Sequence, residues 1–319
     1  LEFNKNMRYF KVTEDNLPIY DNRSGSLVKV GTLEKGEVYE RVSDYGNWHR
    51  IQFGDYYGYV RKSGTEVALT STYKNRAKTK GAIGSLTPKK DVPVYDNTSG
   101  KLVKFATIDK GKKFPIVKDY GNWYEVNLSG RYGYVRKSDV TAIIYPPVGR
   151  TKVAQKTDQI VTVVGNGSKA TVEFWYKSKS GDWVRSFRTN GYVGQKGVGK
   201  VHEGSRRTPK GAFKLGFAFG THNPGTKMPF KQITPNSYWI SNVNDPHYNT
   251  WQERKSSHPS DEHLIKYPKQ YKYGIVINYN TNKPVKGAGS AFFLHVENGN
   301  ATLGCVSIPE LRMVQLMKE

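Results

Sequence analysis

The single cysteine of this 319-residue sequence, Cys305, lies in the segment TLGCVSIPE at 302–310. Nine residues separate it from His295, which lies in the apolar run AFFLHV at 291–296. A thiol beside an imidazole can act as a nucleophile, because the histidine accepts the thiol proton and later returns it to a leaving group. A lone cysteine and a lone strand histidine are also common as inert core residues, so the pair alone supports either interpretation.

The run AFFLHV predicts a buried strand that positions the histidine. Side chains alternate along a strand, so Phe293 and His295 should face one side. The intervening Phe292, Leu294 and Val296 should face the other. The following ENGNAT is rich in turn-forming residues and predicts a connection to the cysteine loop.

A helix is predicted directly after the cysteine loop. SIPE matches the S-x-x-E capping box, with Ser307 as the N-cap and Glu310 as the reciprocating residue. The predicted helix has one apolar stripe, formed by Leu311, Val314 and Met317. Cys305 would then lie two residues before a helix N-cap, where free N–H groups and partial positive charge favour a thiolate.

Gly304, which precedes the cysteine, allows the backbone to approach a reacting carbonyl. The amides of Gly304 and Cys305, or those just after, are candidates for an oxyanion hole. Such a donor contributes about 2.7–4 kcal/mol in enzymes where it has been removed. The sequence therefore predicts Cys305, His295 and Gly304 as catalytic residues.

An internal repeat occupies the N-terminal half, where segment 17–63 recurs at 92–138 with a constant offset of 75 residues. Both copies contain DYGNW and YGYVRKS, and short alternating runs separated by turns predict a small barrel for each. Four aromatic residues fit either a barrel core or an exposed ligand groove: Trp48, Trp123, Tyr59 and Tyr134. The Gly- and Ser-containing stretch 70–85 is predicted to be a linker, and the Pro-Pro at 146–147 marks a second boundary.

Two families are similar to parts of this sequence. Each repeat resembles bacterial SH3-like domains, on the VY of the first strand, the KG turn, the GNW and the GYV. Residues from about 151 resemble the YkuD-type L,D-transpeptidases, on the ordered series EGSRRTPKGAF, DPHYNTW, YGIVINYN, GSAFFLHV and GCVSIP. We therefore expect a mostly β protein with four segments, namely an SH3-like domain at 1–69, the linker at 70–85, a second SH3-like domain at 86–145, and a β-rich catalytic domain with a short C-terminal helix at 146–319.

The cysteine motif departs from the YkuD pattern. That family has 14–17 residues between its first histidine and a Ser/Thr-His-Gly-Cys sequence, whereas only nine residues separate His295 from Cys305 here. Leu303 replaces the second histidine, and Ser307 replaces the arginine that commonly follows the cysteine. Cys305, Gly304 and His295 match the motif, and the role of the second histidine is not carried over.

The resemblance implies a secreted, wall-associated enzyme that needs no metal or cofactor. Cys305 would attack the third residue of a peptidoglycan stem peptide, and an amine of a second stem would resolve the thioester. The chain begins LEFNKN without Met, so we expect a targeting segment to have been removed. Alternatives that remain open are an L,D-carboxypeptidase with water as acceptor, an NlpC-type cysteine peptidase, and a non-catalytic wall-binding protein. NlpC-type enzymes place Cys before His, the reverse of the order here.

The formal net charge of +23 favours polyanionic partners, and we expect anionic wall polymers in addition to stem peptides. No nucleic-acid recognition motif accompanies this charge, so nucleic acid is not expected. No run of 18 apolar residues is present, which predicts no transmembrane helix. The remaining histidines, such as His258 and His263, lack the spacing of a metal site.

Overall fold

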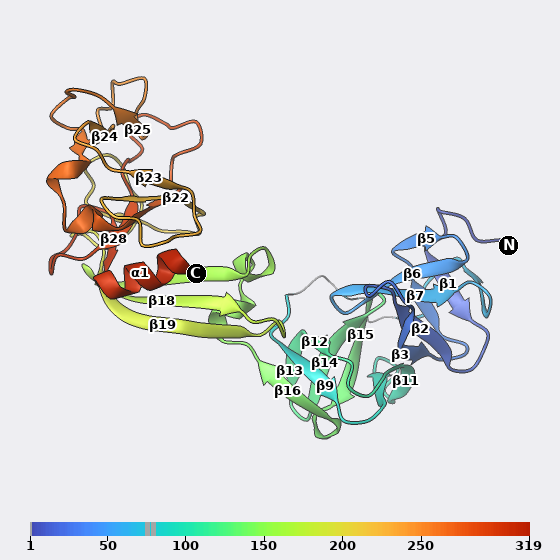
Figure 1. Cartoon of the computed structure of the whole chain (residues 1–319). Helices are drawn as coiled ribbons and strands as arrows, with labels where there is room; N and C mark the ends of the chain where they lie inside the picture. Colours follow the sequence, from blue (N-terminus) through green and yellow to red (C-terminus); the bar gives the residue numbers. More distant parts are fainter. Residues whose placement is uncertain (1, 74–76, 78–80) are drawn as a thin grey trace. The chain divides into compact units, whose positions relative to one another are not determined.

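The computed structural model describes residues 2–73, 77 and 81–319 (Figure 1). The fold is mostly β, and the α-helix assigned among the described residues is a short one at the C-terminal end, as the sequence predicts. The chain divides into two compact units, Leu1–Lys156 and Thr157–Glu319. Within the described residues, every helix is too short or too polar to cross a membrane.

The first unit is built around a ten-stranded sheet that contains both repeats. Its strands, in sheet order, are β13 (Lys118–Tyr120), β14 (Trp123–Leu128), β15 (Arg131–Arg136), β10 (Val92–Asp96), β11 (Val103–Ile108), β3 (Val28–Leu33), β2 (Leu17–Asp21), β7 (Tyr56–Arg61), β6 (Trp48–Phe53) and β5 (Ser43–Tyr45). Equivalent strands of the two repeats follow in mirror-image order. The second repeat occupies the sheet from β13 to β11, and the first repeat continues it from β3 to β5 with its equivalent strands in the reverse order. The two repeats are therefore joined edge to edge in one sheet.

The junction pairs equivalent residues of the two copies. Thr32 lies opposite Thr107, its counterpart 75 residues later, in the antiparallel pair β3–β11. Phe53 lies opposite Leu128, again its counterpart, where β6 meets β14. Such self-complementary pairing is the arrangement of a two-fold symmetric interface, here formed within one chain. Gly31 permits it, because a Cβ at this position would lie 2.3 Å from the carbonyl oxygen of Thr107.

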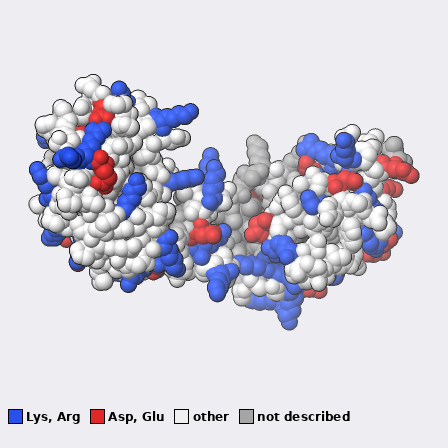
Figure 2. Space-filling model, turned by 45° about the horizontal axis from the view of Figure 1, so that its top comes forward, with Lys and Arg blue, Asp and Glu red and all other residues white. Residues whose placement is uncertain are grey.

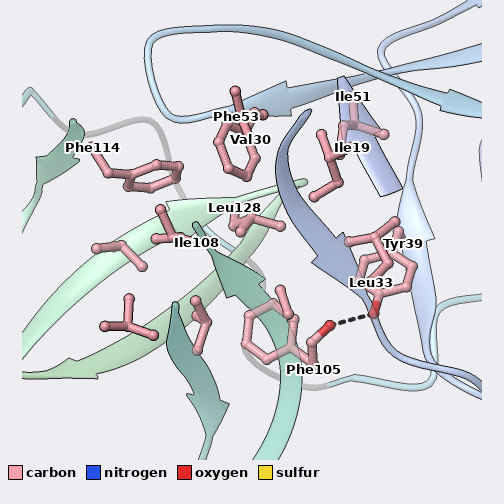
Figure 3. Packing of buried hydrophobic residues seen from close by; sticks show 14 of the residues in the cluster. Ile19, Val30, Leu33, Tyr39, Ile51, Phe53, Phe105, Ile108, Phe114 and Leu128 are labelled. Atoms are coloured by element: carbon pink, nitrogen blue, oxygen red, sulfur yellow. Dashed lines mark hydrogen bonds between the residues drawn. The ribbon is translucent and has the colours of Figure 1, made fainter. Parts of the chain in front are cut away.

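One hydrophobic core spans both repeats, as Figure 3 shows. The rings of Phe53 and Phe114, one from each repeat, meet edge to face with centroids 4.9 Å apart. The buried hydroxyl of Tyr39 donates a hydrogen bond to the carbonyl of Phe105 in the other repeat. Buried Arg131 of the second repeat pairs with Glu37 of the first. The two repeats, which the sequence analysis assigns to separate domains, therefore share one core within one compact unit.

Two small sheets and three 3-10 helices complete this unit. The sheets consist of β4 (Val38–Glu40), β1 (Tyr9–Val12) and β8 (Thr65–Ala68), and of β12 (Phe114–Ile116), β9 (Gly84–Pro88) and β16 (Val140–Ile144). The 3-10 helices are η1 (Lys137–Asp139), η2 (Pro147–Arg150) and η3 (Val153–Gln155). The unit thus extends to Lys156 rather than 145. Part of the predicted linker 70–85, residues 74–76 and 78–80, lies outside the described residues, and β9 begins within its last two residues.

The second unit contains an eight-stranded sheet that positions the candidate site. Its strands, in sheet order, are β17 (Gln159–Asn166), β18 (Lys169–Lys177), β19 (Trp183–Tyr192), β29 (Val306–Ile308), β28 (Phe293–Val296), β27 (Gly274–Ile277), β22 (Leu215–Gly220) and β23 (Phe230–Gln232). Smaller elements are β20 (Val198–Gly199) with β21 (Thr208–Pro209), the sheet β25 (Trp251–Glu253), β24 (Ser237–Trp239) and β26 (Glu262–His263), and the 3-10 helices η4 (Leu264–Lys266) and η5 (Gln270–Lys272). Strand β28 faces two cores, with Leu294 and Val296 in one and Phe293 in the other, as its alternation predicts.

The helix α1 (Glu310–Lys318) begins later than the sequence indicates, and the capping-box prediction is wrong. Ser307 lies in β29, which pairs in parallel with β28, and the N-cap is Pro309, without a side-chain cap. Proline cannot donate to a sheet ladder, so the strand ends before it and the helix follows. The buried face of α1 consists of Met313, Leu316 and Met317. The predicted stripe is wrong at Leu311, which is 69% exposed.

Candidate active site

The parallel pair β28–β29 brings the cysteine and the histidine onto one face of the sheet. His295 lies opposite Ser307 in the register, and Cys305, just before β29, lies beside Phe293. The amide of Phe293 donates to the Cys305 sulfur at 3.4 Å, which fixes this alignment. Strands lie about 4.8 Å apart and rise about 3.3 Å per residue, so the Cα atoms of Cys305 and His295 are about 8 Å apart. Among the described residues, no hydrogen bond joins the two side chains directly.

The thiol of Cys305 is buried and held by the backbone. It donates to the carbonyl oxygen of Ala291 at 3.3 Å and is 9% exposed. Burial, and then the negative charge of Glu262, raise the pKa of this thiol well above its usual range. The prediction of a thiolate at a helix N-terminus is therefore corrected, because β29 and Pro309 separate Cys305 from α1. In the resting site the sulfur is protonated.

The imidazole of His295 is neutral and is oriented by a backbone carbonyl. Its Nδ1 lies 2.8 Å from the carbonyl oxygen of Val296, which can only accept, so Nδ1 carries the hydrogen. The other nitrogen, Nε2, then has a free lone pair. Burial lowers the pKa of His295 to about 4, so the ring is neutral at pH 7. The orienting group is thus a backbone carbonyl.

Two residues that the sequence analysis did not identify, Tyr271 and Glu262, also lie at this site. Tyr271, in η5, packs its ring edge to face against His295 with centroids 5.4 Å apart. Its hydroxyl donates to the carboxylate of Glu262, in β26. Burial raises the pKa of Glu262 to about 7, and the Tyr271 hydroxyl opposes this rise. Neither residue lies near Cys305 in the sequence, so only the tertiary fold brings them to the thiol.

Gly304 is required by the backbone rather than by an oxyanion hole. Its φ is +146°, and a Cβ there would lie 2.7 Å from the Phe292 ring and 3.0 Å from the carbonyl oxygen of Arg207. Its amide donates to Thr302 Oγ1 at 3.0 Å. The expectation that this amide stabilises an oxyanion is corrected, because the donor is already used. The amide of Cys305 remains a candidate.

Segments singled out by the resemblance hold the cysteine loop. Thr208, from EGSRRTPKGAF, donates to the carbonyl oxygen of Gly304 at 2.8 Å. Asn249, from DPHYNTW, accepts from the amide of Ala291 at 3.0 Å and from the indole of Trp239 at 2.8 Å. Ala291 has a φ of +59°, and its carbonyl oxygen accepts the hydrogen bond from the Cys305 thiol. Thr208 therefore holds the backbone of Gly304, which precedes Cys305, and Asn249 holds the backbone of Ala291, which binds the thiol.

The two departures from the family motif differ in their surroundings. Leu303 is 72% exposed, so it does not shield the sulfur from water. Ser307 is buried on the same face as His295, and its hydroxyl finds no hydrogen-bond partner among the described residues. An unpaired buried hydroxyl is costly unless another group satisfies it.

The other candidate residues do not form a metal site. Nδ1 of His258 contacts the Ser260 hydroxyl, and Nε2 of His263 lies 2.6 Å from the carbonyl oxygen of Pro235. Among the residues that the structure describes, no group of three or more histidine, cysteine or acidic side chains could hold a metal ion.

The predicted aromatic residues of the repeats are half-buried rather than core residues. They form matching edge-to-face pairs in the two copies, Tyr20 with Trp48 and Tyr95 with Trp123, each with centroids 5.9 Å apart. Tyr45 is 51% exposed and its counterpart Tyr120 is 50% exposed. The repeats therefore present aromatic surface to solvent.

Comparison with known proteins does not give this chain a family. No family model matches it. No curated protein matches it in sequence. Among solved structures, one similar chain is NlpC2 from Trichomonas vaginalis, at 11% identity, with 44% of this chain and 49% of that chain covered and a TM-score of 0.16. The match thus spans about half of that chain, and a TM-score this low carries no argument about fold or function.

Proposed function

We propose that this protein is a cysteine-dependent L,D-transpeptidase of the YkuD type that acts on peptidoglycan stem peptides. One observation carries the proposal. The buried thiol of Cys305 lies on the same sheet face as a neutral His295 whose Nε2 is free to accept a proton. The ordered motifs that resemble the family support it, because Thr208 and Asn249 from those motifs hold the cysteine loop.

In the first step, Cys305 attacks the carbonyl of the third stem residue. The thiol breaks its hydrogen bond to the Ala291 carbonyl and passes its proton to Nε2 of His295 as the C–S bond forms. This transfer is uphill in the empty site, because the thiol pKa is raised and the imidazole pKa is lowered. The proton transfer is therefore coupled to attack. His295 then protonates the departing D-Ala amine.

In the second step, an amine of a second stem resolves the thioester. The amine forms the new amide bond, His295 takes its proton, and the sulfur receives that proton as it leaves. The amide of Cys305 and the hydroxyl of Ser307 are the donors proposed to bind the substrate carbonyl oxygens. The product is a cross-link between third residues.

The repeats are proposed to bind the wall. Their exposed aromatic residues suit stacking on sugar or peptide, and the net charge of +23 suits anionic polymers. Figure 2 shows Lys and Arg side chains spread over the visible face of both units rather than gathered at one place. A secreted, wall-associated location accompanies this proposal.

A non-catalytic wall-binding protein is the second candidate, and the protonated, buried thiol favours it. An L,D-carboxypeptidase differs from the first proposal only in its acceptor. Incubation with purified stem tetrapeptide, followed by mass spectrometry, separates the three. Loss of D-Ala with dimer formation supports transpeptidation, loss without dimer indicates hydrolysis, and no change supports the binder. Cys305→Ala serves as the control, and any product that persists in it does not arise from this site.

A further inference from the structure

The strongest unexplained feature of the site is a carboxylate that faces the thiol without a cation. Glu262 accepts a hydrogen bond from the Tyr271 hydroxyl, and its charge reaches the Cys305 sulfur. Burial raises the pKa of Glu262 and the Tyr271 hydroxyl opposes this rise, and no lysine or arginine contributes. In a chain with 50 Lys and Arg residues, a half-buried carboxylate that pairs with no lysine or arginine among the described residues is notable, because withdrawing an unpaired charge from water is costly.

The position of Glu262 suits an approach from outside the core. Cys305, His295 and Tyr271 are all buried, whereas Glu262 is half-buried. It lies on β26, an edge strand of the small sheet β25–β24–β26, opposite Trp239, which packs with Cys305 in the same hydrophobic cluster. A ligand group that reaches Glu262 therefore lies beside the sulfur.

We propose that Glu262 is the catalytic residue of the acceptor step, where its carboxylate binds the incoming ammonium group of the second stem and takes a proton from it. This inference rests on the proposed transpeptidase function and assigns the acceptor as an amine. Tyr271 is a positioning residue that holds the carboxylate. A cation at this position supplies the positive charge that this half-buried carboxylate lacks.

The proton balance is complete. An ammonium group transfers one proton to the Glu262 carboxylate and becomes a neutral amine. The amine attacks the thioester carbonyl, the C–N bond forms and the C–S bond breaks. Its second proton passes through His295 to the Cys305 sulfur. Glu262 then releases its proton to solvent. An ordinary carboxylate is a weak base toward an ammonium group, and the raised pKa of about 7 makes Glu262 a stronger one.

The test separates the two half-reactions in Glu262→Gln. The donor tetrapeptide alone should form the thioester on Cys305 at least as fast as in the wild type, because removing the Glu262 charge removes one cause of the raised thiol pKa; intact-protein mass spectrometry measures it. Resolution by a primary alkylamine, charged at neutral pH, should slow by about 100-fold. Resolution by hydroxylamine, uncharged at neutral pH, should be unchanged. The control is Glu253→Gln, on the other edge strand of the same small sheet, where the carboxylate accepts from Ser237 and Thr234.

Tyr271→Phe provides a second variant, because it removes the hydroxyl and keeps the ring against His295. It should slow resolution by the charged amine alone, by a smaller factor. Equal rates for both amines in Glu262→Gln would overturn the inference, and so would loss of thioester formation in a folded Glu262→Gln protein. Absence of a thioester in the wild type would instead overturn the proposed function together with this inference.

Discussion

The Cys305 thiol donates a hydrogen bond to the carbonyl oxygen of Ala291, 3.3 Å away, and Ala291 has a backbone φ of +59°. A residue other than glycine adopts this conformation at a cost, and the surrounding structure must hold it there. Asn249 does so by accepting from the Ala291 amide. The free protein therefore holds the Cys305 thiol protonated and hydrogen-bonded to the backbone.

The first prediction is that iodoacetamide labels Cys305 slowly at neutral pH. Only the thiolate reacts, and burial together with Glu262 raises the thiol pKa. The rate should rise with pH without reaching a plateau while the protein stays folded. Mass spectrometry of the intact protein measures it, with a short cysteine peptide as the exposed reference. A plateau near neutral pH would show a stabilised thiolate and contradict this picture of the site.

The second prediction concerns stability at acid pH. The folded-state pKa of His295 is about 4, below the usual 6.5, so the unfolded chain binds more protons between these values. The stability that neutral His295 contributes to the folded state is therefore fully present above pH 6.5 and is lost as the pH falls toward 4. The full difference is about 3 kcal/mol. Denaturant unfolding of the second unit should show a steeper loss over this window in the wild type than in His295→Gln. Parallel pH curves for the two proteins would exclude a buried neutral histidine.

A third prediction compares two glycines of the cysteine loop region. Gly299→Ala should lose only the free energy needed to hold alanine at a positive φ, because φ is +82° and nothing lies within 4 Å of the added Cβ. That cost is about 1–2 kcal/mol. Gly304→Ala should lose clearly more, because its Cβ would also meet the Phe292 ring and the Arg207 carbonyl. Thermal unfolding of the two variants measures the difference. Equal losses of stability in the two variants would mean that the loop shifts at Gly304 to make room for the added methyl group.

A fourth prediction is that the two repeats unfold together. Phe53→Ala empties part of the shared core beside Phe114 and should cost about 3–5 kcal/mol. Hydrogen exchange followed by mass spectrometry should show protection falling equally in peptides from both repeats. Leu27→Ala, at a 50% exposed position, is the matched control and should change little. Loss of protection confined to the first repeat would indicate two independent barrels.

The local sequence pattern predicted correctly which side chains of the buried strand at 291–296 face each core. The alternation in AFFLHV places Phe293 and Leu294 in different cores, as found. It was not sufficient at SIPE, where a capping-box pattern lies in a strand. The hydrogen bonds that β29 makes with β28 outweigh a local cap, and no local signal reveals a partner strand. Pro309 is the residue that sets the helix start.

The sequence by itself determined the mostly β fold, the 75-residue repeat and the Cys305–His295 pairing as a candidate site, because these follow from neighbours along the chain. Only the tertiary structure decided that equivalent residues Thr32 and Thr107 pair across the repeats. It also decided the protonation of the site. Burial sets the charge state of His295, and burial together with the distant Glu262 carboxylate sets that of Cys305; these effects depend on which segments pack together.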